Sequence, residues 1–455
     1  MKSYSFLSTR RLAKRFATVL GCLSVALIAG CDSDSGAQEL GKQIEPSACF
    51  WVGPYNIDHP ARNFAYPDTG ANYWHAGYIL PEGASLTLHG EYPYARYISL
   101  NSYRADTSPA TAITDNQILP DEGSYNPFLQ GAERQKLQRE FTLTIAQGEP
   151  DGEIPANTLY DYASLGNKAV LIYRVYVADD GRDGQGGVEL PAVELTLSTG
   201  EQLYGQQACD ALQVDTDNLA IPLVPKETYA KIRSNPAFDP AKSPAVWRAA
   251  YNGAFGLQCN FLGQCGGEPK RQVNYYANAD NQYVSTFLDN RLGEVAVTRG
   301  KLPKVPNTLA ADSIFDEVDS QMRYWSICQN EYYSQVVTAC LFDEQLITDE
   351  EGYYTVVTSP GATKPSNASI ECGYNYLPWT EQGDGFGRVV EGGSNKFNEA
   401  LLIVRNMLPK ADFAEAIQNT QRPGDEFAIM AEYLPTTEYM SQADFEALGC
   451  NTKSL

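Results

Sequence analysis

Short stretches of alternating apolar and polar residues recur along this chain, and turns rich in Gly, Pro and Asp separate them. Phe141–Thr144 and Tyr354–Val357 are typical, because they are rich in the β-branched and aromatic residues that favour strands. Many short strands separated by such turns indicate an antiparallel sandwich or jelly roll. The pattern therefore predicts a mostly β protein.

Helical patterns are confined to two regions. Pro225–Arg233 and Ser243–Gly253 predict a short helical connector in the middle of the chain. Near the C-terminus, a helix is predicted from Leu408 to about Asn419, with Pro409 near its start. A last helix is predicted at Ser441–Leu448, with Ser441 as its N-cap.

An internal repeat organises these strands. Arg96–Leu100 of the first half corresponds to Arg323–Ile327 of the second, preceded by Gly90–Pro93 and Gly300–Pro303. Three further blocks follow in the same order: Asp115–Ile118 with Asp343–Leu346, Phe141–Thr144 with Tyr354–Val357, and Leu171–Arg174 with Leu402–Arg405. The first and last arginines are separated by 78 residues in the first half and by 82 in the second. This order and spacing predict a duplicated domain.

The repeat sets the predicted organisation. We expect two tandem antiparallel β-sandwich domains of jelly-roll type, at 46–215 and 271–455, each long enough to bury a core of its own. The helical connector occupies 216–270, and a few short helices lie near the C-terminus.

The N-terminus has the features of an export signal. Its first 15 residues carry basic side chains and no acid, and Phe16–Gly30 is apolar but shorter than the roughly 20 residues of a membrane span. Leu27–Cys31 resembles the bacterial lipobox, which implies cleavage before Cys31 and its acylation, with palmitate among the expected chains. We therefore predict a lipoprotein signal peptide at 1–30 and a flexible tether at 31–45. The alternative is an ordinary signal peptide with a chance cysteine.

Charge narrows the choice of partners. With Lys+Arg 34 against Asp+Glu 56, the formal net charge is −22, which excludes a nucleic-acid binder with a basic footprint. The acidic body also repels anionic headgroups, so we expect the acyl chains on Cys31 to hold the protein on the lipid bilayer. The predicted location is the bacterial cell envelope, facing the periplasm or the cell surface.

Cysteine usage indicates an oxidising compartment. Cys22 leaves with the signal peptide and Cys31 is lipidated, so eight cysteines remain, an even number typical of disulfides in an exported protein. Eight cysteines allow 105 complete pairings. Spacing favours the one that joins Cys49 with Cys209, Cys259 with Cys265, Cys328 with Cys340, and Cys372 with Cys450. A thiolate metal site is disfavoured, because the chain has no C-x2-C pair.

One group of residues has the chemistry of a metal site. All three histidines, His59, His75 and His89, fall within 31 residues. If the segments around Glu82 form a hairpin, His75 lies opposite His89, with Cβ atoms about 5 Å apart. Together with Glu91 and His59 they could bind a divalent metal, which is the candidate cofactor. The alternative is that these are surface histidines, because this register places them away from Leu86 and Leu88.

The repeated arginines Arg96, Arg174, Arg323 and Arg405 have two interpretations. In the first they are structural and pair with buried carboxylates such as Asp115 or Asp343. In the second they bind an anion or a sugar acid. Duplication favours the structural interpretation, because two halves seldom keep the same function.

The ordered blocks resemble a known group. Arg323–Ser326, Gly352–Val357, Asn375–Trp379 and Leu402–Pro409 are similar to bacterial envelope proteins of unknown function built from paired jelly rolls, and Asp121–Phe128 fits the same group. The resemblance implies fold and location but no catalytic residue. The sequence favours an envelope lipoprotein that binds or scaffolds a protein or glycan partner. The alternative is a metal-dependent envelope enzyme that uses the histidine hairpin.

Overall fold

The computed structural model describes residues 48–452, apart from positions 222, 268, 270, 272, 311–313 and 390–397. The predicted signal peptide, Cys31 and the tether to residue 45 lie outside this range. The described part belongs to a single compact unit, and none of its helices is long and apolar enough to cross a membrane.

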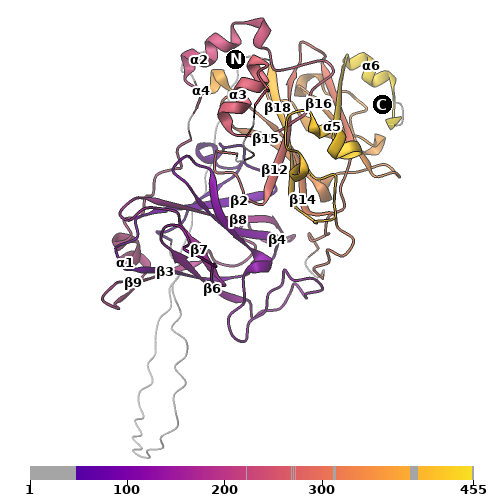
Figure 1. Ribbon diagram of the computed structural model, residues 1–455. Coiled ribbons are helices and arrows are strands. Elements are labelled where there is room, and N and C mark those ends of the chain that lie inside the picture. Colours follow the sequence, from indigo (N-terminus) through magenta and orange to yellow (C-terminus); the bar gives the residue numbers. More distant parts are fainter. Residues whose placement is uncertain are drawn as a thin grey trace, which may run out of the picture. The chain divides into compact units, whose positions relative to one another are not determined.

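The first half of the chain forms two five-stranded sheets (Figure 1). One sheet has the order β1 (Val52–Tyr55), β2 (Ala71–Tyr78), β8 (Ala169–Ala178), β4 (Ala95–Tyr103) and β5 (Pro109–Thr114). The other has the order β10 (Gln202–Tyr204), β9 (Ala192–Thr196), β3 (Ser85–Glu91), β6 (Glu140–Ala146) and β7 (Thr158–Tyr160). All neighbours are antiparallel except β6 and β7.

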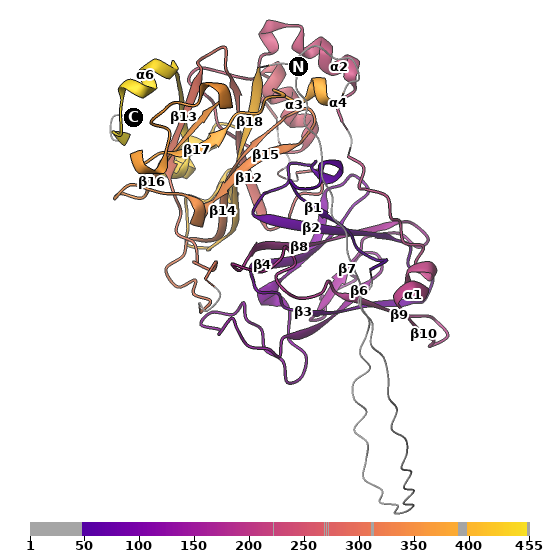
Figure 2. The ribbon, with the colours of Figure 1, turned by 180° about the vertical axis from the view of Figure 1, so that it is seen from behind.

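The second half repeats this topology. Figure 2 shows the same ribbon from behind. Its first sheet has the order β11 (Arg248–Ala249), β12 (Asn281–Asp289), β18 (Glu399–Pro409), β14 (Met322–Asn330) and β15 (Val337–Phe342). Its second has the order β17 (Asn375–Pro378), β16 (Tyr353–Ser359), β13 (Val295–Lys301) and β19 (Thr436–Met440), with β16 and β17 parallel. The mostly β fold predicted from the sequence is confirmed.

Strand register confirms the correspondence of the repeated blocks. Ser99 pairs with Arg174 in the first half, and Ser326 pairs with Arg405 in the second. The predicted domain boundaries stay a prediction, although the strands of the first half end at Tyr204 and those of the second begin at Arg248.

The helices are short and only some lie where the sequence predicts them. They are α1 (Gly205–Ala211), α2 (Lys226–Arg233), α3 (Gly253–Leu262), α4 (Phe386–Val389), α5 (Asp425–Met430) and α6 (Gln442–Ala447). Helix α2 confirms the first connector helix, and α6 begins after the predicted N-cap Ser441, whose side chain accepts a hydrogen bond from the Asp444 backbone.

Two helix predictions are wrong. Ser243–Gly253 contains strand β11, and α3 begins only at Gly253. The segment from Leu408 to Asn419 starts as the end of β18 and forms no more than a 3-10 turn at Ile417–Asn419. Strand β18 is hydrogen-bonded to β12 and β14 on its two sides, so sheet pairing overrides local helix propensity here.

Each half buries a hydrophobic core between its two sheets. In the first half, Leu86 and Leu88 of β3 belong to the same core cluster as Trp74 and Leu171 of the facing sheet. In the second half, Val356 of β16 belongs to one cluster with Trp325 and Leu402. The alternation seen in the sequence thus places one side of each strand in the core.

All four disulfides favoured by spacing are present. They join Cys49 to Cys209, Cys259 to Cys265, Cys328 to Cys340, and Cys372 to Cys450. The first closes a separation of 160 residues across the first half, and the last closes 78 residues at the C-terminus.

Two buried ion pairs cross between the halves in a reciprocal way. Arg96 Nη1 donates to Asp343 Oδ1 at 2.6 Å, and Arg323 Nη1 donates to Asp115 Oδ1 at 2.9 Å. Each aspartate also accepts a hydrogen bond from the backbone of its own half, Asp115 from Ile98 at 3.0 Å and Asp343 from Trp325 at 2.9 Å. The structural interpretation of Arg96 and Arg323 is confirmed, with each partner in the opposite half.

We expect Arg96→Met to lower the free energy of unfolding by about 3–5 kcal/mol, because it leaves the buried Asp343 carboxylate without its guanidinium. The double variant Arg96→Met/Asp343→Leu should recover part of this loss, since it removes both charges. Urea denaturation of the two variants measures the difference. The exposed pair Lys168–Asp215 supplies the control: Lys168→Gln should cost less than about 1 kcal/mol. Equal losses in Arg96→Met and Lys168→Gln would contradict the expectation.

Candidate functional site

The predicted histidine hairpin does not form. Strand β2, which carries His75, pairs with β1 and β8, whereas β3, which carries His89, pairs with β6 and β9. The turn after Leu80 carries the chain from one sheet to the other, so the two strands are not neighbours. The predicted register of His75 opposite His89 is therefore wrong.

The predicted metal ligands lie in separate surroundings. His75 is buried opposite Ile172, while His89 is half-buried with its Nε2 3.0 Å from Glu194 Oε2. His59 and Glu91 are exposed, and His59 Nδ1 lies 2.9 Å from Asn56 Oδ1. These four residues do not form a metal-binding group in the part of the chain that the structure describes.

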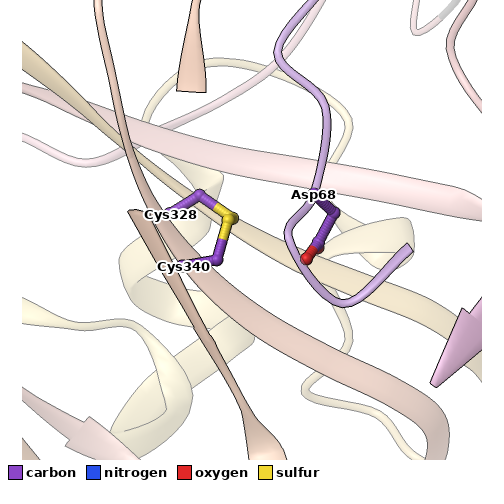
Figure 3. Close-up of side chains that lie close together, drawn as sticks. All are labelled: Asp68, Cys328 and Cys340. Atoms are coloured by element: carbon purple, nitrogen blue, oxygen red, sulfur yellow. A yellow bond between two sulfur atoms is a disulfide. The ribbon is translucent and has the colours of Figure 1, made fainter. Parts of the chain in front are cut away.

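Another cluster, Asp68 with Cys328 and Cys340, brings an oxygen and two sulfurs within 4.8 Å of one another (Figure 3). The two sulfurs form a disulfide, so neither is a thiolate able to bind a metal. Arg405 lies beside both groups, with Nη1 2.7 Å from Cys328 Sγ and 3.5 Å from Asp68 Oδ2. The cluster is therefore a charge-balanced structural contact.

The two remaining repeated arginines lead to a different site. Both are buried: Arg174 is 3% exposed and Arg405 is 2% exposed. Arg174 Nη2 donates to the Tyr276 carbonyl of the second half at 2.6 Å. Arg405 Nη2 donates to the Tyr66 carbonyl of the first half, also at 2.6 Å. Each arginine thus holds a loop of the opposite half.

The loops held in this way have an uncommon backbone. Ala65 and Tyr66 have φ of 63° and 54°, and Tyr275 and Tyr276 have φ of 65° and 54°. Residues other than glycine seldom adopt this left-handed conformation, and such strain persists where surrounding contacts enforce it, often at functional sites. The two loops are equivalent in the repeat, and the buried arginines supply the enforcing contacts.

Both loops line a pair of adjoining cavities of about 170 Å³ and about 70 Å³. The cavities share six lining residues, which are Ala65, Tyr66, Tyr275, Ala277, Tyr283 and Arg405. Tyr332 and Gln335 belong to the larger cavity, and His75 and Arg174 belong to the smaller one. Tyrosine is the most frequent residue in these walls, which are otherwise largely apolar with a few buried polar groups, the usual composition of a small-molecule site.

Four buried polar atoms in these walls have no hydrogen-bond partner among the described residues: Tyr251 Oη, Gln335 Oε1, His75 Nδ1 and Arg174 Nη1. Burial, and then the nearby charge of Lys168, lowers the pKa of His75 to about 4, so this imidazole is neutral near pH 7. Its ring packs edge-on against Tyr55 at 5.5 Å between centroids. Two guanidinium groups, those of Arg174 and Arg405, line the smaller cavity beside this neutral imidazole. Asp68 Oδ2 lies 3.5 Å from Arg405, so Arg174 is the charge without a carboxylate partner among the described residues.

Sequence reasoning singled out Arg174 and Arg405 but not the loops that they hold. The available signal was the abundance of tyrosine, with Tyr73 and Tyr283 at equivalent positions and Tyr275–Tyr276 preceding the second repeat. Many of these tyrosines fall within strand patterns, and packing in the core is the ordinary role of an aromatic residue in a strand. Only the pairing of the halves brings the two loops to one cavity.

Comparison with known proteins finds only distant structural similarity. No family model matches the chain, and no curated protein sequence matches it significantly. A crystal structure of an uncharacterized protein from Burkholderia cenocepacia is similar at 11% identity and a TM-score of 0.44, covering 88% of this chain and 84% of that one. A protein from Vibrio parahaemolyticus is similar at 13% identity and a TM-score of 0.35, covering 79% and 88%. The fold assignment rests on the strand pairing described above.

The burial of His75 predicts a specific loss of stability in acid. The unfolded chain binds a proton at His75 near pH 6.5, whereas the folded protein binds it near pH 4. Between these values the unfolded state holds more protons, so the free energy of unfolding falls as pH falls. From pH 7 to pH 5, the free energy of unfolding should therefore fall by about 2 kcal/mol more in wild type than in His75→Gln.

Urea denaturation of both proteins at pH 7 and pH 5 measures this difference. Asp115 and Asp384, whose pKa values burial raises to about 6, act in the opposite direction but are present in both proteins. The control His59→Gln removes an exposed histidine and should keep the wild-type pH dependence. The same pH dependence in wild type and His75→Gln would contradict the expectation.

Proposed function

We propose that this chain is a non-catalytic lipoprotein of the bacterial cell envelope that binds a sugar unit of an envelope glycan in its tyrosine-lined cavities. Cys31 in the lipobox supports the anchor, and the four disulfides support an oxidising compartment. The resemblance to envelope proteins built from paired jelly rolls supports the same location.

The anchor is tested by Cys31→Ser in the full-length chain. Without the thiol no acyl chain is attached, so the protein should move from the membrane fraction to the soluble fraction, because the acidic body has little affinity for anionic headgroups. Cell fractionation measures the distribution. Ser33→Ala, which changes a neighbouring residue and keeps the thiol, is the matched control. Membrane retention of Cys31→Ser would contradict a lipid anchor.

The observation that carries the binding function is the pair of adjoining cavities. Tyrosine combines an apolar ring face with a polar hydroxyl, which suits a ligand that has both apolar faces and hydroxyl groups. The buried acceptor Gln335 Oε1, without a protein donor among the described residues, suits a ligand hydroxyl. A sugar ring supplies both features.

The concave shape of the site favours a small ligand over a protein partner. A standard protein interface covers about 800 Å² on each partner, whereas this site is a pair of small cavities with buried polar atoms. The alternative of a metal-dependent enzyme depended on the pairing of His75 with His89, which the strand pairing contradicts. We therefore favour a binding role.

Tyr275→Ala tests the binding function, because this ring lines both cavities. D-glucose, N-acetyl-D-glucosamine and D-glucuronate are used as probes on residues 32–455, with ligand-observed saturation-transfer NMR as the measurement. At least one probe should bind wild type, and Tyr275→Ala should weaken that binding at least 10-fold. The matched control Tyr160→Ala removes a half-buried tyrosine from β7, outside both cavities, and should bind as wild type does. Absence of binding by all three sugars would overturn the glycan proposal.

A further inference from the structure

The repeat contains two equivalent arginine sites with different partners. Arg405 lies beside Cys328 Sγ and Asp68, whereas Arg174 donates to the Tyr103 hydroxyl. Arg174 and Arg405 occupy the same register against Ser99 and Ser326, and each donates to the carbonyl of a left-handed tyrosine in the opposite half. The environment of one arginine can therefore be compared directly with that of the other.

The difference in charge lies two residues after the left-handed tyrosines, Tyr66 and Tyr276. Asp68 Oδ1 accepts a hydrogen bond from the Gly70 backbone at 2.9 Å, and Asn278 Oδ1 accepts one from the Asp280 backbone at 3.1 Å. The two side chains thus form the same local turn. At Arg405 this position supplies a carboxylate, with Asp68 Oδ2 3.5 Å from Nη1. In the equivalent loop it supplies the neutral amide of Asn278.

Arg174 consequently retains a buried charge without a carboxylate partner among the described residues. Its guanidinium lies 5.6 Å from the Tyr73 ring and 5.7 Å from the Tyr103 ring, which stabilises it in part. Its Nη1 has no hydrogen-bond partner in the described part of the chain. A buried cation in this state is costly unless an anion reaches it.

Arg174 is also a wall of the smaller cavity, beside His75 and Tyr73. We propose that this cavity is a carboxylate site, in which a ligand carboxylate supplies to Arg174 the negative charge that Asp68 supplies to Arg405. The inference rests on the proposed function, and it assigns the ligand to the acidic sugars, of the uronic acid class. The sugar ring occupies the tyrosine-lined larger cavity, and its carboxylate accepts a hydrogen bond from Nη1.

A carboxylate fits this cavity better than a phosphate. Of the two guanidinium groups that line the smaller cavity, Arg405 has the Asp68 carboxylate beside it, so Arg174 supplies the uncompensated positive charge, with Nη1 as its unpartnered donor among the described residues. His75 is neutral near pH 7 because burial, aided by Lys168, lowers its pKa to about 4. A singly charged group matches that charge, whereas a phosphate dianion needs more donors and more positive charge. The volume of about 70 Å³ also suits the smaller group.

The experiment compares D-glucuronate with D-glucose, which differ in the carboxylate. Isothermal titration calorimetry on residues 32–455 should show glucuronate bound at least 10-fold more tightly by wild type. Asn278→Asp supplies Arg174 with an internal carboxylate in the manner of Asp68, and it should lower glucuronate affinity at least 10-fold while leaving glucose affinity unchanged. Because this substitution is close to isosteric, thermal melting should show a folded protein.

A second pair of probes separates this inference from the proposed function. Benzoate and benzamide also differ in charge but carry no sugar. Preferential binding of benzoate that is lost in Asn278→Asp would support the carboxylate site even if no sugar binds. Equal affinity of wild type for glucuronate and glucose, together with equal affinity for benzoate and benzamide, would overturn the site while leaving a neutral-sugar function intact. Tighter binding of inorganic phosphate than of either carboxylate would also overturn it.

Discussion

The reciprocal ion pairs Arg96–Asp343 and Arg323–Asp115 are the constraint on which the rest of this structure depends. Each aspartate accepts a backbone hydrogen bond within its own half and a guanidinium hydrogen bond from the other half. Arg96, Asp115 and Asp343 are thus paired with an opposite charge only across the two halves, whereas Arg323 also contacts Glu317 of its own half. Because an unpaired buried charge costs several kcal/mol, the first half taken alone would contain Arg96 and Asp115 without these partners, and the second half taken alone would contain Asp343 without its guanidinium. The charges therefore specify the pairing of the halves, and the apolar contacts around Tyr97 and Tyr324 add area to it.

Contacts between the two halves also form the walls of the cavities. Arg174 and Arg405 reach across to the carbonyls of Tyr276 and Tyr66, and they fix two loops whose left-handed backbone would otherwise relax. Since both loops line both cavities through Tyr66 and Tyr275, the binding walls exist only in the paired arrangement. Stability and binding geometry are therefore supplied by one set of cross-half contacts, and a substitution that loosens the halves should also deform the cavities.

The sequence alone predicted the strands, the repeat and the four disulfides, because alternation, cysteine spacing and repetition can be recognised along the chain without knowledge of the tertiary packing. The prediction that His75 lies opposite His89 was wrong because the turn at Pro81–Gly83 is compatible both with a hairpin and with a crossing between sheets. Only tertiary packing decides between the two. The prediction that repeated arginines pair with buried aspartates was correct for Arg96 and Arg323. The repeat alone, however, cannot distinguish a pair of Arg96 with Asp115 from a pair of Arg96 with Asp343. The predicted helix after Leu408 failed for the related reason that β18 is held on both sides by strands distant in sequence.

Reciprocal contacts of this kind, in which one residue touches the counterpart of its own partner, are the pattern of an isologous dimer interface. In a homodimer every substitution occurs twice, so a residue cannot be a carboxylate in one subunit and an amide in the other. A single chain that carries both copies is free of that symmetry. The difference between Asp68 and Asn278 is a change that covalent fusion permits: one copy keeps the complete charge set and holds the halves in register, while the other can give up a charge and acquire a separate task.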